Sequence, residues 1–405
     1  MDTLLDAIEI FIPGDWGNEE YSQDAPNEVI CIRGADIENV KCGIYQNIPI
    51  RYVSNTSFNK KTLESGDIII EKSGGSPTQS TGRVCYISDE LIESKKNVVC
   101  SNFCAAFRMK SKWYYKYIYY YLHNIYSQGN FFNYEGKTSG IRNLLLETAF
   151  QAITLPDILT DVQKRTVKIL DKIDQKINLN TRMNAELEAM AKRLYDYWFV
   201  QFDFPDENGK PYKSSGGKMV YNPTLKRKIP AGWEACTLGD FCDLYQPKTI
   251  GTDEMSKNGK YHVYGANGLI GFYDKYNHEK SEIVMACRGN SCGAINRTMP
   301  FSWITGNAMV LSVKDKSISN EFISQCTNYM NIKGAITGSG QPQLTRENLA
   351  PLLMIYPLQN ILKQFSKKVT PIIEHRLHIQ KTNEYLTNLR DSLLPMLMNG
   401  QVTVE

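Results

Sequence analysis

Two turns of the chain carry polar side chains of the kinds that read DNA. Arg, Lys, Asn, Gln and Ser form hydrogen bonds with base edges and phosphates, and glycine lets the backbone approach a groove closely. One turn follows the apolar run 67–70, and the other follows residues 282–287. Together with nearby polar residues they give the following candidates for DNA contact: Ser73, Gly74, Gly75, Ser76, Gln79, Ser80, Arg83, Lys137 and Arg142 in the first half of the chain, and Tyr264, Asn267, Arg288, Asn290, Ser291, Arg297 and Gln341 in the second. The same residues could instead form ordinary hairpin turns, so each contact is a hypothesis.

The common catalytic motifs are missing. An adenine methyltransferase holds its flipped base with a motif such as Asn-Pro-Pro-Tyr, but the chain has no Pro-Pro pair. The nearest match to a phosphate-binding loop, residues 216–219, lacks both the spacing and the hydroxyl residue. The tightest cysteine spacings, Cys100/Cys104 and Cys287/Cys292, have no nearby pair of histidines. The sequence therefore predicts no catalytic residue and no metal site.

The composition is that of a globular protein without a membrane span. Of the 405 residues, 42% are hydrophobic and 22% charged, and no apolar stretch approaches the ~20 residues that cross a bilayer. The first residues lack the basic and apolar regions of a secretory signal, so we expect a cytoplasmic protein with reduced cysteines. The formal net charge is only +3. Binding to nucleic acid would therefore depend on locally clustered basic residues or on a partner that supplies the clamp.

The sequence contains an internal repeat with a period of roughly 200 residues. The first and second copies match in the same order at several points, none of which is specific alone. The matches are residues 3–6 with 237–240, 66–69 with 281–284, 139–144 with 339–344, 155–156 with 356–357, and Gln163 with Gln364. Their shared order predicts a duplication of one large unit.

Each copy begins with a strand-rich part and ends in a long helix. Residues 157–199 contain neither glycine nor proline, and apolar residues recur at the alternating steps of four and three that are typical of a coiled coil. The second helix, residues 358–398, repeats this pattern, although Pro371 and Pro395 should kink or end it. The residues expected to pack the two helices together are Ile169, Ile173, Ile177, Asn184, Leu187, Leu194, Val369, Ile372, Asn383, Leu386 and Leu393. Asn184 and Asn383 fall at matching positions, where they either set the register of the pair or lie exposed.

The duplication predicts an α+β protein. Two mixed α/β domains, related by an approximate twofold axis, would be separated by two long antiparallel spacer helices that form a coiled coil. Two heads on a stiff spacer would suit two half-sites of a DNA duplex separated by an unread gap. The expected boundaries are 1–155 for the first head, 156–202 for the first helix, 203–232 for a linker, 233–355 for the second head, 356–398 for the second helix and 399–405 for a C-terminal tail.

A dense aromatic run occupies residues 113–122. Aromatic platforms can stack on single-stranded nucleic acid. The density of the run favours a helix that packs on a sheet, with some tyrosines exposed at its rim. We therefore predict a structural role.

Several stretches resemble one known family, the specificity subunits of type I restriction–modification systems. Residues 194–205 and 208–217 resemble the end of the first spacer helix and the segment after it. Residues 229–234, 264–271 and 305–308 resemble the entry to the second target recognition domain and motifs within it, and 389–395 resemble the end of the second spacer helix. The resemblance covers essentially the whole chain. One departure is the short segment before Thr3, which predicts a short first strand.

The resemblance implies a subunit that does no chemistry itself. Each target recognition domain would read one half of a bipartite, asymmetric target in double-stranded DNA. The spacer helices would set the gap and dock two methyltransferase subunits, and restriction subunits would complete the complex. The partners would use S-adenosylmethionine, ATP and Mg, and this chain would bind no cofactor. Asn143 and Leu144 recur near the second helix as Gln343 and Leu344, which favours a shared structural role.

Three other interpretations remain open from the sequence. The chain could be the specificity subunit of a different DNA-modification or phage-defence assembly. It could be a nuclease or methyltransferase with an unrecognised active site. It could also be an adaptor that binds only protein partners.

Overall fold

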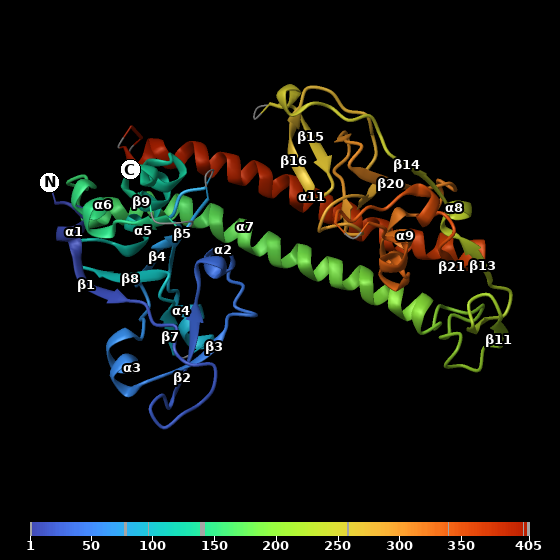
Figure 1. Cartoon of the computed structure of the whole chain (residues 1–405), viewed down its shortest axis with the longest axis horizontal. Coiled ribbons are helices and arrows are strands. Elements are labelled where there is room, and N and C mark those ends of the chain that lie inside the picture. The colour runs from blue at the N-terminus through green and yellow to red at the C-terminus, as the bar shows by residue number, and fades with distance from the viewer. Residues whose placement is uncertain are drawn as a thin grey trace. The chain divides into compact units, whose positions relative to one another are not determined.

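Two long helices, α7 (Thr160–Tyr195) and α11 (Gln359–Met398), each contribute to both structural units of the chain (Figure 1). The computed structural model describes residues 2–76, 79–95, 97–137, 142–256, 259–338, 340–399 and 401–402. The first unit spans Met1–Arg182 and Lys381–Glu405, and the second spans Met183–Gln380. Each unit therefore combines one globular head with a stretch of both helices, whereas the sequence suggested heads and helices as separate domains.

The head of the first unit is built on three sheets. The largest is antiparallel, with the strand order β1-β8-β4-β6, and the other two have the orders β3-β2-β7 and β5-β10-β9. The strands are β1 (Ile8–Pro13), β2 (Asn27–Ile32), β3 (Ile50–Val53), β4 (Ile68–Glu71), β5 (Ser73–Gly74), β6 (Val84–Tyr86), β7 (Val98–Cys100), β8 (Cys104–Met109), β9 (Glu135–Lys137) and β10 (Arg142–Leu144). The helices of this head are α1 (Leu4–Ala7), α2 (Ile37–Lys41), α3 (Asn55–Lys61), α4 (Asp89–Ser94), α5 (Tyr115–Ser127) and α6 (Leu146–Ala152).

The aromatic run forms part of the core of this head. Most of it lies in α5, where Tyr117, Ile118 and Tyr120 are buried together with Phe107 of β8. The prediction of a structural role for the run is confirmed. Because the rings fill the space between the helix and the sheet, they are not available as a stacking platform.

The head of the second unit repeats the topology of the first. Its largest sheet has the order β14-β20-β17-β18 and is again antiparallel. Its three-stranded sheet pairs β15 antiparallel with β16 and parallel with β19, as β2 pairs with β3 and β7 in the first head. The elements are β13 (Glu234–Thr237), β14 (Cys242–Tyr245), β15 (Tyr261–Gly265), β16 (Gly268–Tyr273), β17 (Ile283–Ala286), β18 (Ile295–Arg297), β19 (Trp303–Ile304), β20 (Ala308–Val313), β21 (Leu353–Tyr356), α8 (Leu238–Phe241), α9 (Asn320–Cys326) and α10 (Arg346–Leu349). The predicted duplication and the mixed α/β fold are confirmed.

The first turn of each head shows how closely the copies agree. Thr3 and Thr237 cap α1 and α8 with the same capping box, in which the threonine hydroxyls donate to Asp6 and Asp240 at 2.7 and 2.6 Å. The strand before this turn differs between the heads. In the second head β13 pairs with β21 over four residues, whereas in the first head a single bridge, Thr3 to Thr154, takes its place.

The two long helices are more continuous than their sequences suggested. α7 is followed by a π-turn at Asp196–Val200, and α11 runs without a break through Pro371 and Pro395. The expectation that these prolines end the helix is wrong. No helix in the described part of the chain combines the length and the hydrophobicity that crossing a bilayer requires.

Within the first unit, α7 and α11 run antiparallel and meet through polar pairs. The Asn180 side-chain amide donates to the Asn383 carbonyl oxygen at 2.8 Å, and Arg390 lies 3.0 Å from Asp174. Asn383 therefore lies in the seam, and its partner there is Asn180, which was not among the predicted packing residues. Asn184 belongs to the second unit and is only half-buried. A seam asparagine with a matching partner favours one register of a helix pair.

Other predicted packing residues divide between core and surface. Val369 is fully buried, and Leu194, Ile372 and Leu393 pack partly buried against the cores of their units. Ile173, Ile177, Leu187 and Leu386 are half-buried. Ile169 is 37% exposed, so its prediction as a packing residue is wrong. The neighbouring Val167 and Leu170 enter the core instead, because α7 is covered by the head as well as by α11.

The segment predicted as a linker is folded. Residues 203–232 contain an antiparallel hairpin of β11 (Met219–Asn222) and β12 (Arg227–Pro230). Phe204 stacks between Tyr212 and Trp233, with ring centroids 4.7 and 5.0 Å away. These aromatic contacts bury enough apolar surface to order a segment whose glycines and polar residues suggested a loop.

Replacing Asn383 with alanine should destabilise the first unit. The Asn180 amide is almost fully buried and would lose the partner that satisfies it. We expect the free energy of unfolding to fall by about 1–3 kcal/mol, measured by denaturant titration. Asn388→Ala, at an exposed position of the same helix, is the matched control and should change it by less than about 0.5 kcal/mol. Equal effects of the two substitutions would contradict a structural role for the asparagine pair.

Candidate nucleic-acid interface

In the first head, one small sheet brings together candidate residues from distant parts of the sequence. In β5-β10-β9, Arg142 pairs through its backbone with Gly74 on one side and with Lys137 on the other. Asn143 lies opposite Ser73, and the Ser73 hydroxyl donates to its side-chain oxygen at 2.5 Å. The Lys137 side chain lies outside the part of the structure that is described. Strands β5, β9 and β10 therefore form one small surface.

A buried carboxylate holds this surface together. Glu135 accepts hydrogen bonds from the backbone and hydroxyl of Thr81, at 2.7 and 3.0 Å, and pairs with Arg142 at 2.7 Å. The Arg142 side chain remains 35% exposed and also lies over the Phe132 ring. Glu135 therefore holds the Arg142 guanidinium in place, while the exposed part of the side chain could contact a phosphate or a base edge.

The other candidates of this turn differ in exposure. Gly75 and Gln79 are exposed, and Ser76 is half-buried, whereas Ser73 and Ser80 are buried. Arg83 points inward and forms a bidentate pair with the almost fully buried Glu71, at 2.8 and 2.6 Å. Ser80 and Arg83 therefore shape the turn from inside, and Gln79 and Arg142 are the side chains best placed to touch a ligand.

The second head repeats one backbone pairing of the first head with different side chains. We call this pairing, residues 72–73 with 143–144 in the first head and 287–288 with 343–344 in the second, the loop frame. The Leu344 backbone N–H donates to the Cys287 carbonyl at 2.9 Å, as Leu144 donates to Lys72 at 2.8 Å in the first head. Both leucines are buried, so the predicted structural role of Leu144 is confirmed. On this frame Arg288 lies opposite Gln343, in the place where Ser73 lies opposite Asn143.

Four candidates of the second head are exposed to solvent. Asn267, Arg288, Asn290 and Gln341 are exposed. Asn267 occupies the turn between β15 and β16, and the other three lie on the two loops that are joined by the pairing of Arg288 with Gln343. Ser291 in the same loop is half-buried. The structure thus brings three of these residues together and leaves Asn267 on a separate turn.

Two predicted contact residues of the second head are structural. Tyr264 is 4% exposed, and its hydroxyl accepts a hydrogen bond from the Met299 backbone at 3.1 Å. Arg297 forms a buried ion pair with Glu321 at 2.5 Å, and burial lowers the pKa of the Arg297 guanidinium. Neither side chain faces solvent as a groove-reading residue must, so both leave the set of candidates for DNA contact.

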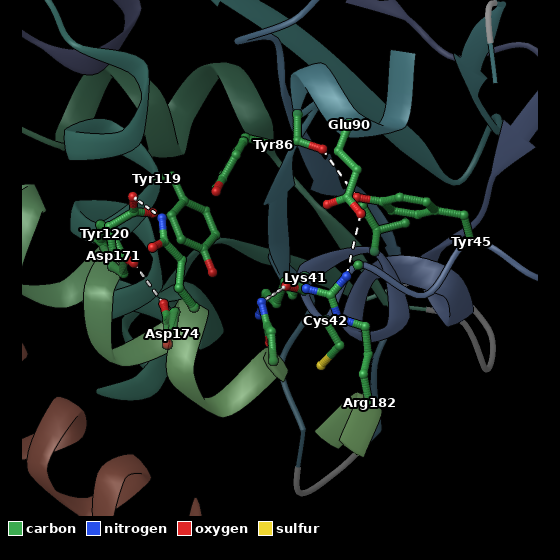
Figure 2. Close-up of a pocket in the computed structure, with 15 residues that line it drawn as sticks. Lys41, Cys42, Tyr45, Tyr86, Glu90, Tyr119, Tyr120, Asp171, Asp174 and Arg182 are labelled. Atoms are coloured by element: carbon green, nitrogen blue, oxygen red, sulfur yellow. Dashed lines mark hydrogen bonds and ion pairs between the residues drawn. The ribbon is translucent and has the colours of Figure 1, made fainter. Parts of the chain in front are cut away.

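A polar junction joins the first head to α7 and encloses a pocket of about 200 Å³ (Figure 2). Figure 2 shows Asp174 of α7 pointing toward Tyr120 and Arg182 toward Glu90. The Tyr120 hydroxyl donates to Asp174 at 2.7 Å, and Lys116 pairs with Asp171 at 2.9 Å. Because these groups satisfy one another, the junction is a structural contact that orients the head on the helix.

His123 of α5, which stacks on Tyr119, is expected to make the first head sensitive to acid. Burial, aided by the positive charges of Lys41 and Arg390, lowers the pKa of His123 to about 3. Below pH 6.5, His123 becomes protonated in the unfolded chain but stays neutral in the folded chain. The free energy of unfolding therefore decreases as the pH falls from 6.5 toward 3. The expected loss is up to about 1.4 kcal/mol per pH unit, or about 2 kcal/mol at pH 5.

This prediction can be checked by denaturant titration at pH 7.5 and pH 5. The variant His123→Phe keeps the ring stacked on Tyr119 and should reduce the difference between the two pH values by about 2 kcal/mol. His375→Phe, at an exposed position of α11, should leave the difference unchanged. If both variants behave like the parent chain, the acid sensitivity has another origin.

Comparison with known families shows to which family the chain belongs. A family model described as the type I restriction modification DNA specificity domain matches residues 31–189 and again 230–385. The chain belongs to this family. The first matched segment begins in the first head and the second begins at the end of β12, just before the second head. Both extend into the long helix that follows, so each repeat unit corresponds to one specificity domain.

Individual relatives agree with the family. The specificity subunit of type I restriction enzyme MjaIX from Methanocaldococcus jannaschii is 26% identical over 281 residues, which cover 64% of this chain and 62% of that protein. This chain thus matches less than two thirds of that relative's length. The HindI specificity subunit from Haemophilus influenzae is 24% identical over 325 residues, covering 62% of this chain and 69% of that protein. A crystal structure of the type I S subunit from M. genitalium shares the fold, with a TM-score of 0.59 and 17% identity over 98% of this chain and 95% of that one.

Two functional features of this specificity-domain chain escaped the sequence. The carboxylates Glu71 and Glu135 position Arg83 of the turn and Arg142 of β10, yet neither carboxylate was a candidate. Glu71 did carry a signal, because it ends a strand whose other residues are isoleucines. Glu135 carried none, since its neighbours are polar and its burial depends on Thr81, which is far away in the sequence. Among the described residues, no group of three or more His, Cys, Asp or Glu side chains could hold a metal ion.

Proposed function

We propose that this chain is the DNA-specificity subunit of a type I restriction–modification complex, in which each head reads one half of a bipartite, asymmetric target. The observation that carries the proposal is the recurrence of one loop frame with different side chains on it. The bonds Leu144 to Lys72 and Leu344 to Cys287 repeat the frame. Ser73 and Arg288 occupy the same place on it and differ in size and charge. A common frame with unlike side chains suits two domains that bind one kind of ligand but different sequences.

The chain itself would do no chemistry. Helices α7 and α11 would set the unread gap and dock two methyltransferase subunits, and restriction subunits would join them. S-adenosylmethionine, ATP and Mg would be used by these partners. The surface of α7 supports a protein partner, because Met183 and Met190 are 37% and 46% exposed and lie two helical turns apart on one face.

The charge of the chain fits this division of labour. A protein that holds DNA alone neutralises many phosphates and usually has a clear basic excess. The net charge here is +3 over 405 residues. The heads would therefore supply base recognition, while the partners supply much of the phosphate contact.

Expression in a host without adenine methylation tests the proposal. The chain would be produced together with its methyltransferase subunits, and genomic DNA would be read by methylation-sensitive single-molecule sequencing. We expect one bipartite methyladenine motif, which is absent when the gene for this chain is omitted. The same motif without the chain would contradict the proposal. Turnover of DNA by the purified chain alone, lost on a point substitution, would favour an enzyme instead.

A further inference from the structure

The segment that follows α7 carries an unbalanced positive charge. Residues 208–232 contain six basic side chains and no acidic one. Because the net charge of the whole chain is +3, all the other residues together carry a net charge of −3. The six are exposed to solvent and are Lys210, Lys213, Lys218, Lys226, Arg227 and Lys228. This segment therefore concentrates a positive charge that the rest of the chain lacks.

These basic side chains form no ion pair with any other described residue. Two of the acidic residues just before the segment have other hydrogen-bond donors. Asp203 accepts from the Ser214 backbone and hydroxyl at 2.7 and 2.6 Å. Asp206 accepts from the backbone of Asn208 and Lys210, both at 2.8 Å. Clustered cations without an ion pair inside the chain attract an anionic surface of a partner.

The hairpin of β11 and β12 holds half of this charge in a fixed position. Ile229 of β12 is 2% exposed and belongs to the core of the second unit. The turn is closed by the Leu225 N–H, which donates to the Asn222 side chain at 2.9 Å. Lys226 follows with a φ of +52°, in the left-handed region that favours glycine or asparagine. Because this backbone is already ordered, residues 226–228 can meet a partner at a low cost in conformational entropy.

Exposed apolar side chains lie beside these cations. Val220 and Tyr221 of β11 are 46% and 59% exposed, and Tyr221 lies opposite Lys228 in the strand pairing. Leu358, which is 44% exposed, adjoins the end of the segment, because a Cβ atom at Gly232 would lie 3.6 Å from its side chain. Phosphate contact depends mainly on charge, whereas a protein interface combines apolar and aromatic side chains with a polar rim. This composition therefore favours a protein partner.

The position of the hairpin also favours a protein over the bound duplex. The Cys287 N–H of the loop frame donates to the Asn307 carbonyl just before β20, at 3.2 Å. The Lys314 N–H just after β20 donates to the Phe241 carbonyl of α8, at 3.1 Å. The six residues of β20 separate these two places by about 20 Å. The hairpin joins the head beyond α8, through β13, at the end of the sheet away from the candidate DNA-contact loops (Figure 1).

The exposed apolar face of α7 leads directly to this segment. Met183, Met190 and Tyr197 recur every seven residues and are 37%, 46% and 39% exposed. Seven residues make about two helical turns, so the two methionines share one face of α7, and Tyr197 follows in the π-turn. The helix face proposed to meet a methyltransferase subunit therefore continues toward the hairpin.

We propose that the hairpin surface, which consists of Val220, Tyr221 and residues 226–228, docks an acidic patch of the methyltransferase subunit that binds α7. The proposal rests on the proposed function, since it needs that partner, and it deepens the function by naming a contact outside the two helices. The three cations pair with carboxylates at the rim of the contact, and Tyr221 is covered at its centre. Charge pairing of this kind speeds association and weakens as salt is added.

The test measures binding of the purified full-length chain to its purified methyltransferase subunit by isothermal titration calorimetry, at low and at high salt. The triple variant Lys226→Glu, Arg227→Glu, Lys228→Glu changes only exposed side chains, so its thermal melting should match that of the parent chain. We expect the Kd of one bound methyltransferase subunit to rise at least about tenfold at low salt and much less at high salt. An unchanged Kd would overturn the proposal.

A matched control makes the same change of charge elsewhere in the second head. Lys260→Glu, Lys275→Glu, Lys280→Glu alters three exposed lysines and should leave the Kd unchanged. A rise equal to that of the hairpin variant would show a general effect of net charge and would overturn the assignment to the hairpin surface.

Two further measurements separate the apolar contact and the duplex from this effect. Tyr221→Ser removes an exposed ring without changing the charge, and it should raise the same Kd several-fold at both salt concentrations. Binding of the assembled complex to target and unrelated duplexes is measured in parallel. If the triple variant binds the methyltransferase subunit like the parent chain but loses affinity for both duplexes equally, the hairpin contacts phosphate and the proposal is wrong.

The failure of this proposal differs from failure of the proposed function. A triple variant that assembles like the parent chain, in a complex that still methylates a bipartite motif, contradicts only the hairpin contact. A motif that does not depend on this chain contradicts the function on which the contact rests.

Discussion

Replacing residues 233–355 with the same segment of another family member will change one half of the recognised sequence and leave the other half intact. The second head contains a frame of its own, held by the bond from Leu344 to Cys287, and none of its frame residues belongs to the first unit. If each head reads its half-site alone, recognition should be exchanged as a block. We expect complete replacement of one half of the methyladenine motif in single-molecule sequencing.

The graft must respect the contact between this head and the helices of its own unit. Phe322 of α9 packs on Tyr195 and Phe199, with ring centroids 5.7 and 4.9 Å apart, and Phe199 packs on Phe365 at 5.0 Å. A donor segment with a small residue at position 322 would leave a cavity worth about 3–5 kcal/mol. Donors that carry an aromatic residue there should give a folded chimera.

The reciprocal exchange is the control. Replacing residues 1–155 should change the other half of the motif and only that half. A change of both halves in either chimera would show that the heads do not read independently, and the two-head proposal would fail.

Much of the fold could be predicted from the sequence because the sequence contains an internal duplication. Matches such as Thr3 with Thr237 are weak alone, but their order is informative, and both threonines do form the same capping box. The β4/β6 and β17/β18 hairpins were visible as apolar runs on either side of glycine-containing turns. Local signals of this kind persist in the folded state because strand pairing and helix capping act on neighbouring residues.

The seam between the helices was only partly predictable. A heptad pattern gives the spacing of buried positions, but it does not say which face is covered by a head and which by the other helix. Ile169 lies exposed because Val167 and Leu170 turn toward the head, and Asn383 bonds to Asn180, which was not among the predicted packing residues. The register of two helices depends on the sum of their tertiary contacts, which no single pattern contains.

For the candidate interface, the sequence indicated the loops, but it did not indicate which of their side chains are accessible. Residue type showed that arginines on polar turns could read DNA, but the outcome depended on the carboxylates nearby. Arg83 and Arg297 point inward because each pairs with a buried carboxylate, Glu71 and Glu321 respectively. Arg142 pairs with Glu135 but stays partly exposed. A buried carboxylate pairs with a nearby arginine, but the position of that carboxylate is known only when the fold is known.

The Arg297–Glu321 pair of the second head gives the sharpest test of this distinction. Glu321 is 2% exposed at its side chain, and its other oxygen accepts a hydrogen bond from Gln325 at 2.7 Å. Arg297→Ala would leave that carboxylate buried and unpaired, so we expect the free energy of unfolding of the second unit to fall by about 3–5 kcal/mol. Denaturant titration with a probe in the second head would measure this loss. Arg193→Ala, in an exposed pair of α7, is the matched control and should cost less than about 1 kcal/mol.

The double variant Arg297→Met, Glu321→Leu separates a structural role from a role in reading DNA. Because it removes both charges and keeps most of the volume, it should recover most of the lost stability. If Arg297 only holds the core, the recovered chain will direct methylation to the unchanged motif. If Arg297 reads a base, as its residue type first indicated, the chain will fold but lose discrimination at one position of the second half-site. The buried geometry of the pair predicts the first result, since the Arg297 side chain is only 16% exposed and its guanidinium is bound to a core carboxylate.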